Sequence, residues 1–282
     1  MTNNNLRDKD KYIYFDTSIY NFLLDDPDKS YLIRIMREKN HIVIPSVVNL
    51  CEMLMTRDPK RKIGLIRIYE ELRNNRDPLK PYTWLLRESV ESIRRGNGEF
   101  KIYYPIRIND DTESICRDLI SQNKIILEPD LNNARDYIQG VPEKDKPADE
   151  KQYFACIESE NGTQYLINLF DSICNARNIG SRLNRDMKIA IIRSPLNPWK
   201  YYLESYLYLF YRRAFPKTNY RKYANPGPLD LQQCVYFFWA GKVVIEDNAF
   251  IEIAMQLRKL RRYNLEILSY HDFKQFLFAK EP

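Results

Sequence analysis

Four short apolar runs near the two ends of the chain limit its fold more than any other feature. The runs are KYIYF (11–15), HIVIP (41–45), KVVIE (242–246) and LEILS (265–269). Their β-branched and aromatic residues favour strands. Because the runs are almost continuously apolar, we expect helices to cover both faces of the sheet that they form.

Helical patterns separate these runs. They cover residues 28–39, 46–56, 60–73, 249–263 and 271–278. Ser46 is predicted to cap the second of these helices. A further helix is predicted to open near Pro228 and to continue through LQQCVYFFW (231–239). Strands that alternate with helices long enough for crossover connections form parallel sheets, so the sequence predicts an α/β fold with a parallel sheet.

Residues 78–224 interrupt the alternation. Their apolar patterns are helical and cover residues 84–95, 112–122, 163–177 and 198–213. We therefore predict one α/β domain built from residues 1–77 and 225–282. A mostly helical insertion at 78–224 splits this domain and becomes basic and aromatic toward its end.

The composition is that of a soluble globular protein, with 44% hydrophobic and 29% charged residues. No uncharged apolar stretch reaches the ~18 residues of a membrane span, and the polar start MTNNNLRDKD is unlike a signal peptide. The five cysteines are widely spaced without a CxxC pair, and there are only two histidines. Neither a disulfide framework nor a zinc site is predicted, and a reducing cytoplasm is the expected setting.

Carboxylates occur where parallel α/β proteins place their sites, at the carboxyl ends of strands and in the helices that follow. Asp16 ends the first run and Asp247 follows the third. Asp230 lies in the opening turn of a predicted helix, and Glu52 lies inside another among apolar neighbours, where a carboxylate needs a partner. Four carboxylates at one point would repel one another, and divalent cations relieve that repulsion. Hard oxygen ligands select Mg²⁺ or Mn²⁺.

The order of these motifs resembles that of the PIN-domain ribonucleases. The matching segments are YIYFDTSIYNFL, HIVIPSVVNLCEML, GPLDLQQCVYFFWAGKVVIEDNAF and LEILSYHDFKQFL. The resemblance implies a PIN-like three-layer fold and a metal-dependent endoribonuclease that cuts single-stranded RNA. It assigns the catalytic and metal-binding roles to Asp16, Glu52, Asp230 and Asp247, and an accessory role to Ser18.

The sequence departs from the family at the last acid. The family usually has Thr or Ser just before this acid, whereas this chain has Glu246 before Asp247 and Asn248 after it. Glu246 and Asn248 are therefore rival or accessory ligands. The resemblance also implies a toxin or defence role with a neutralising or regulatory protein partner.

A basic and aromatic stretch precedes Asp230. Cations that follow the phosphates and aromatic rings that stack on unpaired bases are typical of single-strand binding. The loop-like part of the stretch, RRAFPKTNYRKY (212–223), supplies the predicted RNA contacts. These contacts are Arg212, Arg213, Lys217, Tyr220, Arg221 and Lys222.

Three other interpretations stand beside the nuclease. Asp16 and Asp230 can simply cap helices or complement helix dipoles. An inactive acid cluster would leave a non-catalytic RNA- or protein-binding module on a PIN-like scaffold. The DTS sequence is also faintly similar to the nucleophile loop of haloacid-dehalogenase phosphotransfer enzymes, but Ser18 stands where their second acid belongs.

Overall fold

The structure is a computed structural model of the chain. The residues that it describes are 9–96, 101–105, 112–114, 116–118, 151–152, 154–155, 160–176, 183–193, 201–202, 204–205, 208, 233–261 and 264–279.

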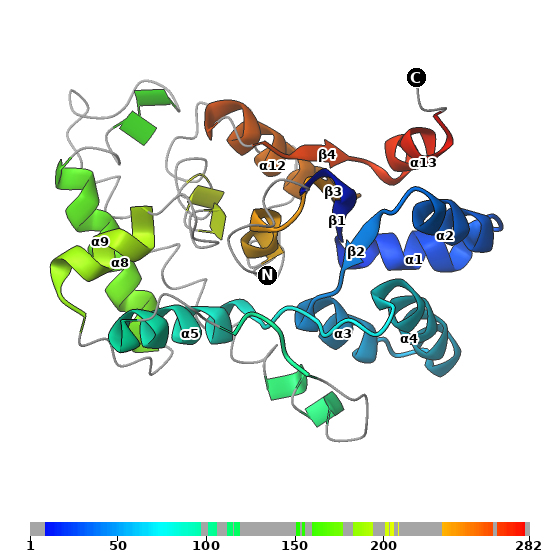
Figure 1. Cartoon of the computed structure of the whole chain (residues 1–282), viewed down its shortest axis with the longest axis horizontal. Coiled ribbons are helices and arrows are strands. Elements are labelled where there is room, and N and C mark those ends of the chain that lie inside the picture. The colour runs from blue at the N-terminus through cyan, green and yellow to red at the C-terminus, as the bar shows by residue number, and fades with distance from the viewer. Residues whose placement is uncertain are drawn as a thin grey trace.

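A four-stranded parallel sheet forms the centre of the fold (Figure 1). Its strands are β1 (Tyr12–Phe15), β2 (Ile42–Ile44), β3 (Lys242–Val244) and β4 (Glu266–Leu268). In space their order is β2-β1-β3-β4, and each neighbouring pair is parallel. Tyr14 of the central strand pairs with Ile44 on one side and Val243 on the other. The four predicted strands and the parallel sheet are confirmed.

Six helices of the two terminal blocks pack around this sheet. They are α1 (Thr17–Asp25), α2 (Lys29–Glu38), α3 (Val47–Leu54), α4 (Pro59–Arg73), α12 (Asn248–Arg261) and α13 (Tyr270–Phe278). Ser46 caps α3 as predicted, because its side chain accepts a hydrogen bond from the Asn49 amide at 3.1 Å.

The predicted helix at 231–239 is wrong within its described part. That part forms a 3₁₀-helix, η4 (Cys234–Phe238), in place of an α-helix. Its valine and aromatic residues have low helix propensity. Four successive residues, from Cys234 to Phe237, are buried, so the segment is held by packing on all sides and not by one apolar stripe.

The described elements of residues 78–224 are mostly helical. The longer helices are α5 (Tyr82–Arg95), α8 (Glu160–Ala176) and α9 (Arg185–Arg193). Leu79, just before α5, forms isolated bridges with Ser46 and Tyr103. These bridges place the start of this segment directly beside the end of β2.

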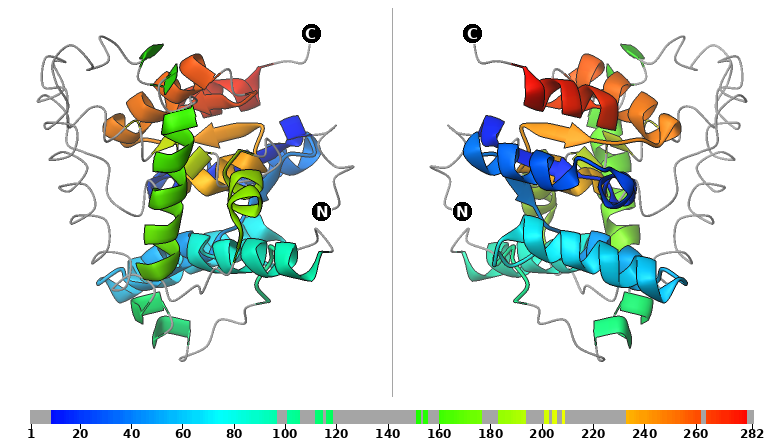
Figure 2. Two further views of the ribbon diagram at one scale, coloured as in Figure 1. Left: turned by 90° about the vertical axis from the view of Figure 1, so that its left-hand side faces the viewer. Right: turned by 90° about the vertical axis from the view of Figure 1, so that its right-hand side faces the viewer.

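Helices cover both faces of the sheet, as the apolar strands predict. Ile13 and Phe15 belong to an apolar cluster with α1, α2, α4 and α13, whereas Tyr14 belongs to a second cluster with α5, α8, α9 and α12. Figures 1 and 2 show the sheet between these two groups of helices. The arrangement is compatible with a three-layer α/β fold.

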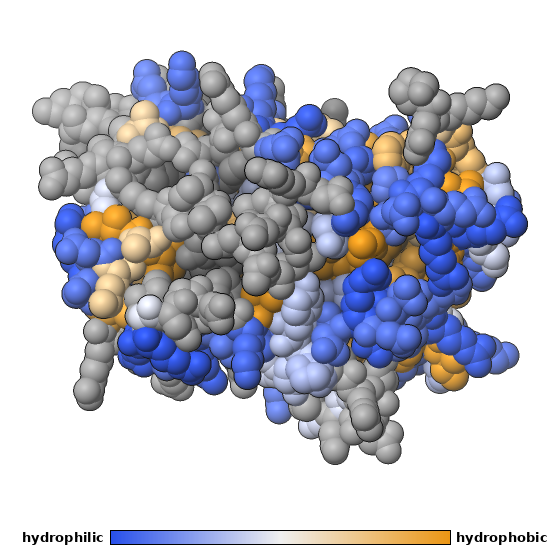
Figure 3. Space-filling model, viewed as in Figure 1, coloured by the Kyte–Doolittle hydropathy of each residue, from blue (hydrophilic) through white to orange (hydrophobic). Residues whose placement is uncertain are grey.

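The outer surface is mixed. In Figure 3, the helices α1, α2 and α4 present mostly hydrophilic side chains, with apolar patches between them. None of the helices formed by the described residues has the length and apolar character that a membrane crossing requires.

Candidate functional site

Polar residues gather at the edge of the sheet where the parallel strands end. Asp16 directly follows β1, and its amide donates a hydrogen bond to the Val244 carbonyl at the end of β3 at 3.0 Å. The elements α1, α3 and η4 bring further polar side chains to the same place. We call this set of residues the carboxyl-edge site: Asp16, Thr17, Ser18, Ser46, Asn49, Glu52 and Gln233.

Asp16 is a buried carboxylate at the start of α1. It is 5% exposed, and its Oδ2 accepts hydrogen bonds from the Ser18 amide at 3.2 Å and from Ser18 Oγ. Burial raises the pKa of Asp16, while hydrogen bonds from Ser18 and the nearby Gln233 side chain oppose that rise. The opposing groups are uncharged, so a cation at this position would stabilise the ionised form of Asp16.

Glu52 reaches the same edge through Thr17. Thr17 Oγ1 donates a hydrogen bond to Glu52 Oε2, and Asn49 Nδ2 donates one to Thr17 Oγ1 at 2.9 Å. Asn49 Nδ2 also donates to the Phe15 carbonyl at 3.2 Å. The prediction that Glu52 requires a partner is confirmed, and its partner follows Asp16 immediately in the chain.

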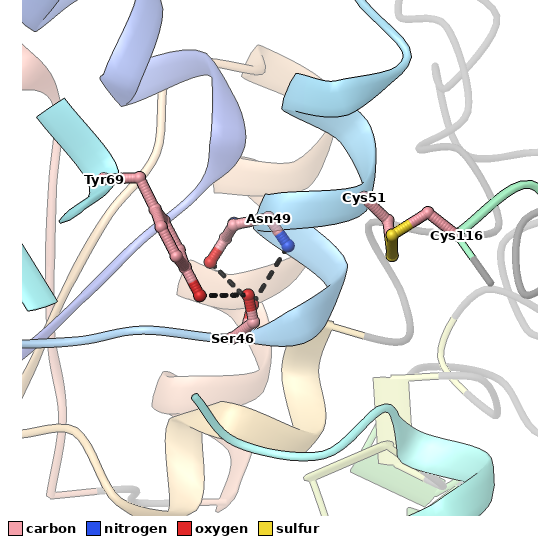
Figure 4. The surroundings of a disulfide bond; sticks show 5 residues. All are labelled: Ser46, Asn49, Cys51, Tyr69 and Cys116. Atoms are coloured by element: carbon pink, nitrogen blue, oxygen red, sulfur yellow. Dashed lines mark hydrogen bonds between the residues drawn. A yellow bond between two sulfur atoms is a disulfide. The ribbon is translucent and has the colours of Figure 1, made fainter. Parts of the chain in front are cut away.

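A buried hydrogen-bond network links these residues to the elements that surround them. Tyr14 Oη donates to Gln233 Oε1 at 2.8 Å, and Ser46 Oγ donates to Asn49 Oδ1 at 2.6 Å. Tyr69 Oη donates to the Ser46 carbonyl at 3.1 Å; Figure 4 shows this contact beside Asn49. The network joins β1, α3, α4 and the segment before η4, so it fixes the orientation of the site residues.

Gln233 has a buried side-chain amide beside Asp16. The residue is 0% exposed. Its Nε2 forms no hydrogen bond of good geometry in the part of the chain that the structure describes, although the side chain is close enough to Asp16 to lower its pKa. An unsatisfied buried donor costs about 1–3 kcal/mol. The position therefore suits a ligand oxygen that enters beside Asp16.

The acids after β3 have helix-capping contacts of their own. Asp247 is exposed, and its Oδ1 accepts a hydrogen bond from the Phe250 amide in α12 at 2.7 Å. Glu246 Oε1 accepts from the Tyr270 amide at the start of α13 at 2.6 Å. Asn248 is exposed at the first position of α12. The contacts of Asp247 and Glu246 are of the helix-capping kind, and Asp16, for which the sequence analysis considered capping, is itself the N-cap of α1.

Part of the predicted site lies outside the described residues. This applies to Asp230 and to the six predicted RNA contacts, Arg212, Arg213, Lys217, Tyr220, Arg221 and Lys222. Asp230 precedes Gln233 of the carboxyl-edge site by three positions in the sequence. Among the described residues, no three His, Cys, Asp or Glu side chains are grouped closely enough to hold a metal ion.

The donor chemistry of the carboxyl-edge site nevertheless fits Mg²⁺ or Mn²⁺. Mg²⁺ usually keeps several waters and is held by one or two carboxylates together with substrate phosphates. The described part of the edge supplies two carboxylates, Asp16 and Glu52, and no competing soft ligand is among the site residues. A cation there would also offset the burial that raises the pKa of Asp16.

A disulfide bond lies next to the site. It joins Cys51 of α3 to Cys116, which is 65 residues away in the sequence, and Cys51 immediately precedes Glu52 (Figure 4). Cys174 and Cys234 are buried, and neither forms a disulfide with another described residue. The sequence analysis predicted no disulfide framework and did not identify this single pair, because wide spacing in the sequence does not exclude proximity in the fold.

The sequence patterns identified some of the site and missed the rest. They singled out Asp16, Ser18 and Glu52. They missed Tyr14 and Gln233. The one signal for Tyr14 was a hydroxyl in the middle of a buried strand, since such a group needs a hydrogen-bond partner.

Comparisons with known proteins give no relative: no family model, no curated protein and no solved structure matches this chain.

Asn49→Ala is expected to destabilise the protein by about 2–3 kcal/mol, because it leaves buried partners at Phe15 and Ser46 unsatisfied. Urea unfolding measures this loss. The matched control is Asn168→Ala, which removes an exposed amide that accepts a hydrogen bond from Gln164, and should cost less than about 0.5 kcal/mol. Equal losses in the two variants would show that the Asn49 network contributes nothing to stability.

Proposed function

We propose that the protein is a metal-dependent endoribonuclease with a PIN-like core that hydrolyses phosphodiester bonds of single-stranded RNA. The observation that carries the proposal is the burial of Asp16 at the junction of β1 and β3, beside the buried Gln233 and linked through Thr17 to Glu52. A residue needed only as a helix cap gains nothing from burial that raises its pKa. Such perturbed carboxylates are concentrated at functional sites.

The PIN-like core is supported by the order of the elements. The two parallel strands β1 and β3 lie side by side at the centre of the sheet although more than 200 residues separate them. Each is followed by an acid, Asp16 in one case and Glu246 with Asp247 in the other. This is the order of motifs on which the resemblance to the PIN-domain ribonucleases rests.

In this proposal Asp16, Glu52 and Asp230 hold Mg²⁺ or Mn²⁺, with Asp247 at the adjoining strand end. Such an ion, when bound, lowers the pKa of water and stabilises charge on phosphodiester oxygens. Ser18 orients Asp16, and Thr17 and Asn49 orient Glu52. Gln233 Nε2 supplies a hydrogen-bond donor for a phosphate oxygen, and the cations of 212–222 bind the strand beyond the cleaved bond.

The test is cleavage of an end-labelled, unstructured RNA by the full chain. We expect internal cuts in Mg²⁺ or Mn²⁺, none in EDTA, and recovery when excess metal is returned. Asp230→Asn should remove the activity, whereas Asp58→Asn should retain it, because Asp58 is an exposed cap of α4 whose side chain accepts hydrogen bonds from the Lys60 and Arg61 amides and from none of the site residues. Cleavage that persists in EDTA, or that is equal in both variants, would refute the assignment.

A non-catalytic RNA- or protein-binding module is the second candidate. The capping roles of Glu246 and Asp247 favour it, since both acids already serve helix ends. In that case RNA would bind but remain uncut with every divalent metal. Activity confined to small phosphoesters would instead indicate a phosphotransfer enzyme.

A further inference from the structure

A hollow lies at the edge of the sheet opposite the carboxyl-edge site, where the strands begin. It has a volume of about 720 Å³ and is lined by the start of β2 and by the ends of α2 and α4. We call it the amino-edge hollow. It shares no residue with the carboxyl-edge site, and its volume is within the range of about 300–1,000 Å³ that is typical of small-molecule sites.

The amino-edge hollow is strongly cationic. Its charged lining residues are Lys11, Arg37, Lys39, Arg76 and a single acid, Glu71. Arg37 Nη2 lies 3.4 Å from Glu71 Oε1 in an exposed ion pair. In the part of the chain that the structure describes, neither Lys39 nor Arg76 lies within ion-pairing distance of a carboxylate, although Lys39 Nζ donates one hydrogen bond to the Ala279 carbonyl at 2.8 Å. The lining therefore has an excess of positive charge that its own acid does not neutralise.

Helix ends explain only part of this charge. Cations near the carboxyl ends of α2 and α4 complement the helix dipoles. Backbone amides already satisfy carbonyls there, since the His41 amide donates to Met36 O at 2.7 Å and the Arg76 amide donates to Arg73 O at 2.9 Å. The guanidinium of Arg76 is therefore not required to satisfy the end of α4, and it remains able to bind an anion.

Two asparagines add neutral donors to the rim. Asn40 and Asn74 line the hollow and have φ angles of 56° and 47°. Glycine is the usual residue in this left-handed conformation after a helix, and asparagine adopts it at some cost. Asparagine at both positions places a side-chain amide where glycine would place none.

Apart from His41, the remaining lining is apolar. Ile33, Met36 and Leu72 line the hollow and are buried in the core beneath it. A ligand that fits has a compact, poorly hydrated ring at one end and several negative charges at the other.

We propose that the amino-edge hollow binds a free nucleoside phosphate, with the ring on the apolar residues and the phosphates against Arg37, Lys39 and Arg76. The proposal does not depend on RNA cleavage at the opposite edge.

Calorimetric titration of the full chain with ATP tests the proposal. The titration is done in EDTA, so that metal-mediated binding at the carboxyl-edge site does not contribute. Arg76→Gln is expected to weaken binding by about 10-fold or more, because it removes charged hydrogen bonds to phosphate. The matched control is Arg34→Gln, which removes an exposed arginine of α2 that does not line the hollow, and which should leave the affinity unchanged.

Glu71→Gln is expected to strengthen ATP binding, and a misfolded variant would not give that result. The substitution frees Arg37 from its ion pair and removes the only acid of the lining, so ATP should bind more tightly, by up to about 5-fold for an exposed pair. No binding of ATP in the millimolar range would overturn the proposal, as would equal weakening by Arg34→Gln and Arg76→Gln. Pyrophosphate binding as tightly as ATP would exclude a role for the ring, and a 5′-phosphorylated RNA that binds when ATP does not would exclude a free nucleotide.

Discussion

Asp16→Asn is expected to lower the rate of RNA cleavage at least about 100-fold, the lower end of what a group acting in proton transfer or charge stabilisation contributes. The substitution separates the two roles of this residue. Asparagine is as good an N-cap as aspartate, so its side-chain oxygen can still accept the hydrogen bond from the Ser18 amide. Only the negative charge is lost. The initial rate in saturating Mn²⁺ is the measurement.

The matched control is Asp25→Asn at the other end of the same helix. Asp25 is exposed and forms an ion pair with Arg61 at 2.7 Å. Exposed pairs of this kind contribute about 0–1 kcal/mol to stability, so the variant should fold and cut RNA as the wild type does. If Asp16→Asn also retains full activity, Asp16 is a helix cap and not part of a catalytic site.

The pH dependence of stability gives an independent check on Asp16. Burial raises the pKa of Asp16 in the folded state. When the pH exceeds the ordinary pKa of aspartate, the unfolded chain therefore releases a proton that the folded protein still binds. Stability from this group therefore decreases as the pH rises through that value. Asp16→Asn should be more stable than the wild type at neutral pH, and the difference should disappear in acid, as measured by urea unfolding at several pH values.

The strands could be predicted because each is a short, almost continuously apolar run, as expected for a sheet that helices cover on both faces. The cap at Ser46 could also be predicted, since serine before an apolar helix is a local signal. The segment after Gln233 could not, because its run of valine and aromatic residues suits several conformations, and contacts from distant parts of the chain select the 3₁₀-helix. Sequence patterns thus predict the elements whose conformation depends on their own residues. They do not predict an element whose conformation depends on contacts with distant parts of the chain.

The candidate site shows the same limit. The carboxylate of Asp16 was predictable from its place after a strand, and the need of Glu52 for a partner followed from its apolar neighbours. The identity of that partner, Thr17, depends on how α3 packs against the start of α1. Gln233 reaches Asp16 across more than 200 residues of sequence, and no single-sequence pattern carries such a pairing.

The Cys51–Cys116 disulfide is expected to stabilise the fold by about 4 kcal/mol, because it closes a loop across 65 residues of sequence and thereby restricts the unfolded chain. For a protein of this size, each kcal/mol corresponds to about 2–4 °C in Tm. Protein purified without reductant should therefore lose roughly 8–16 °C in Tm when a dithiol reductant is added. Thermal unfolding followed by circular dichroism measures the shift.

Two variants distinguish loss of the bond from loss of a buried thiol. Cys116→Ser should have a low Tm that no longer responds to reductant. Cys174→Ser alters a free, buried cysteine, so its Tm should decrease through packing alone and still respond to reductant. Thiol titration of the denatured wild type should find two more thiols after reduction than before. Equal counts would show that the bond does not form, and then α3 is held beside residue 116 by packing alone, with Glu52 positioned by its hydrogen bond from Thr17.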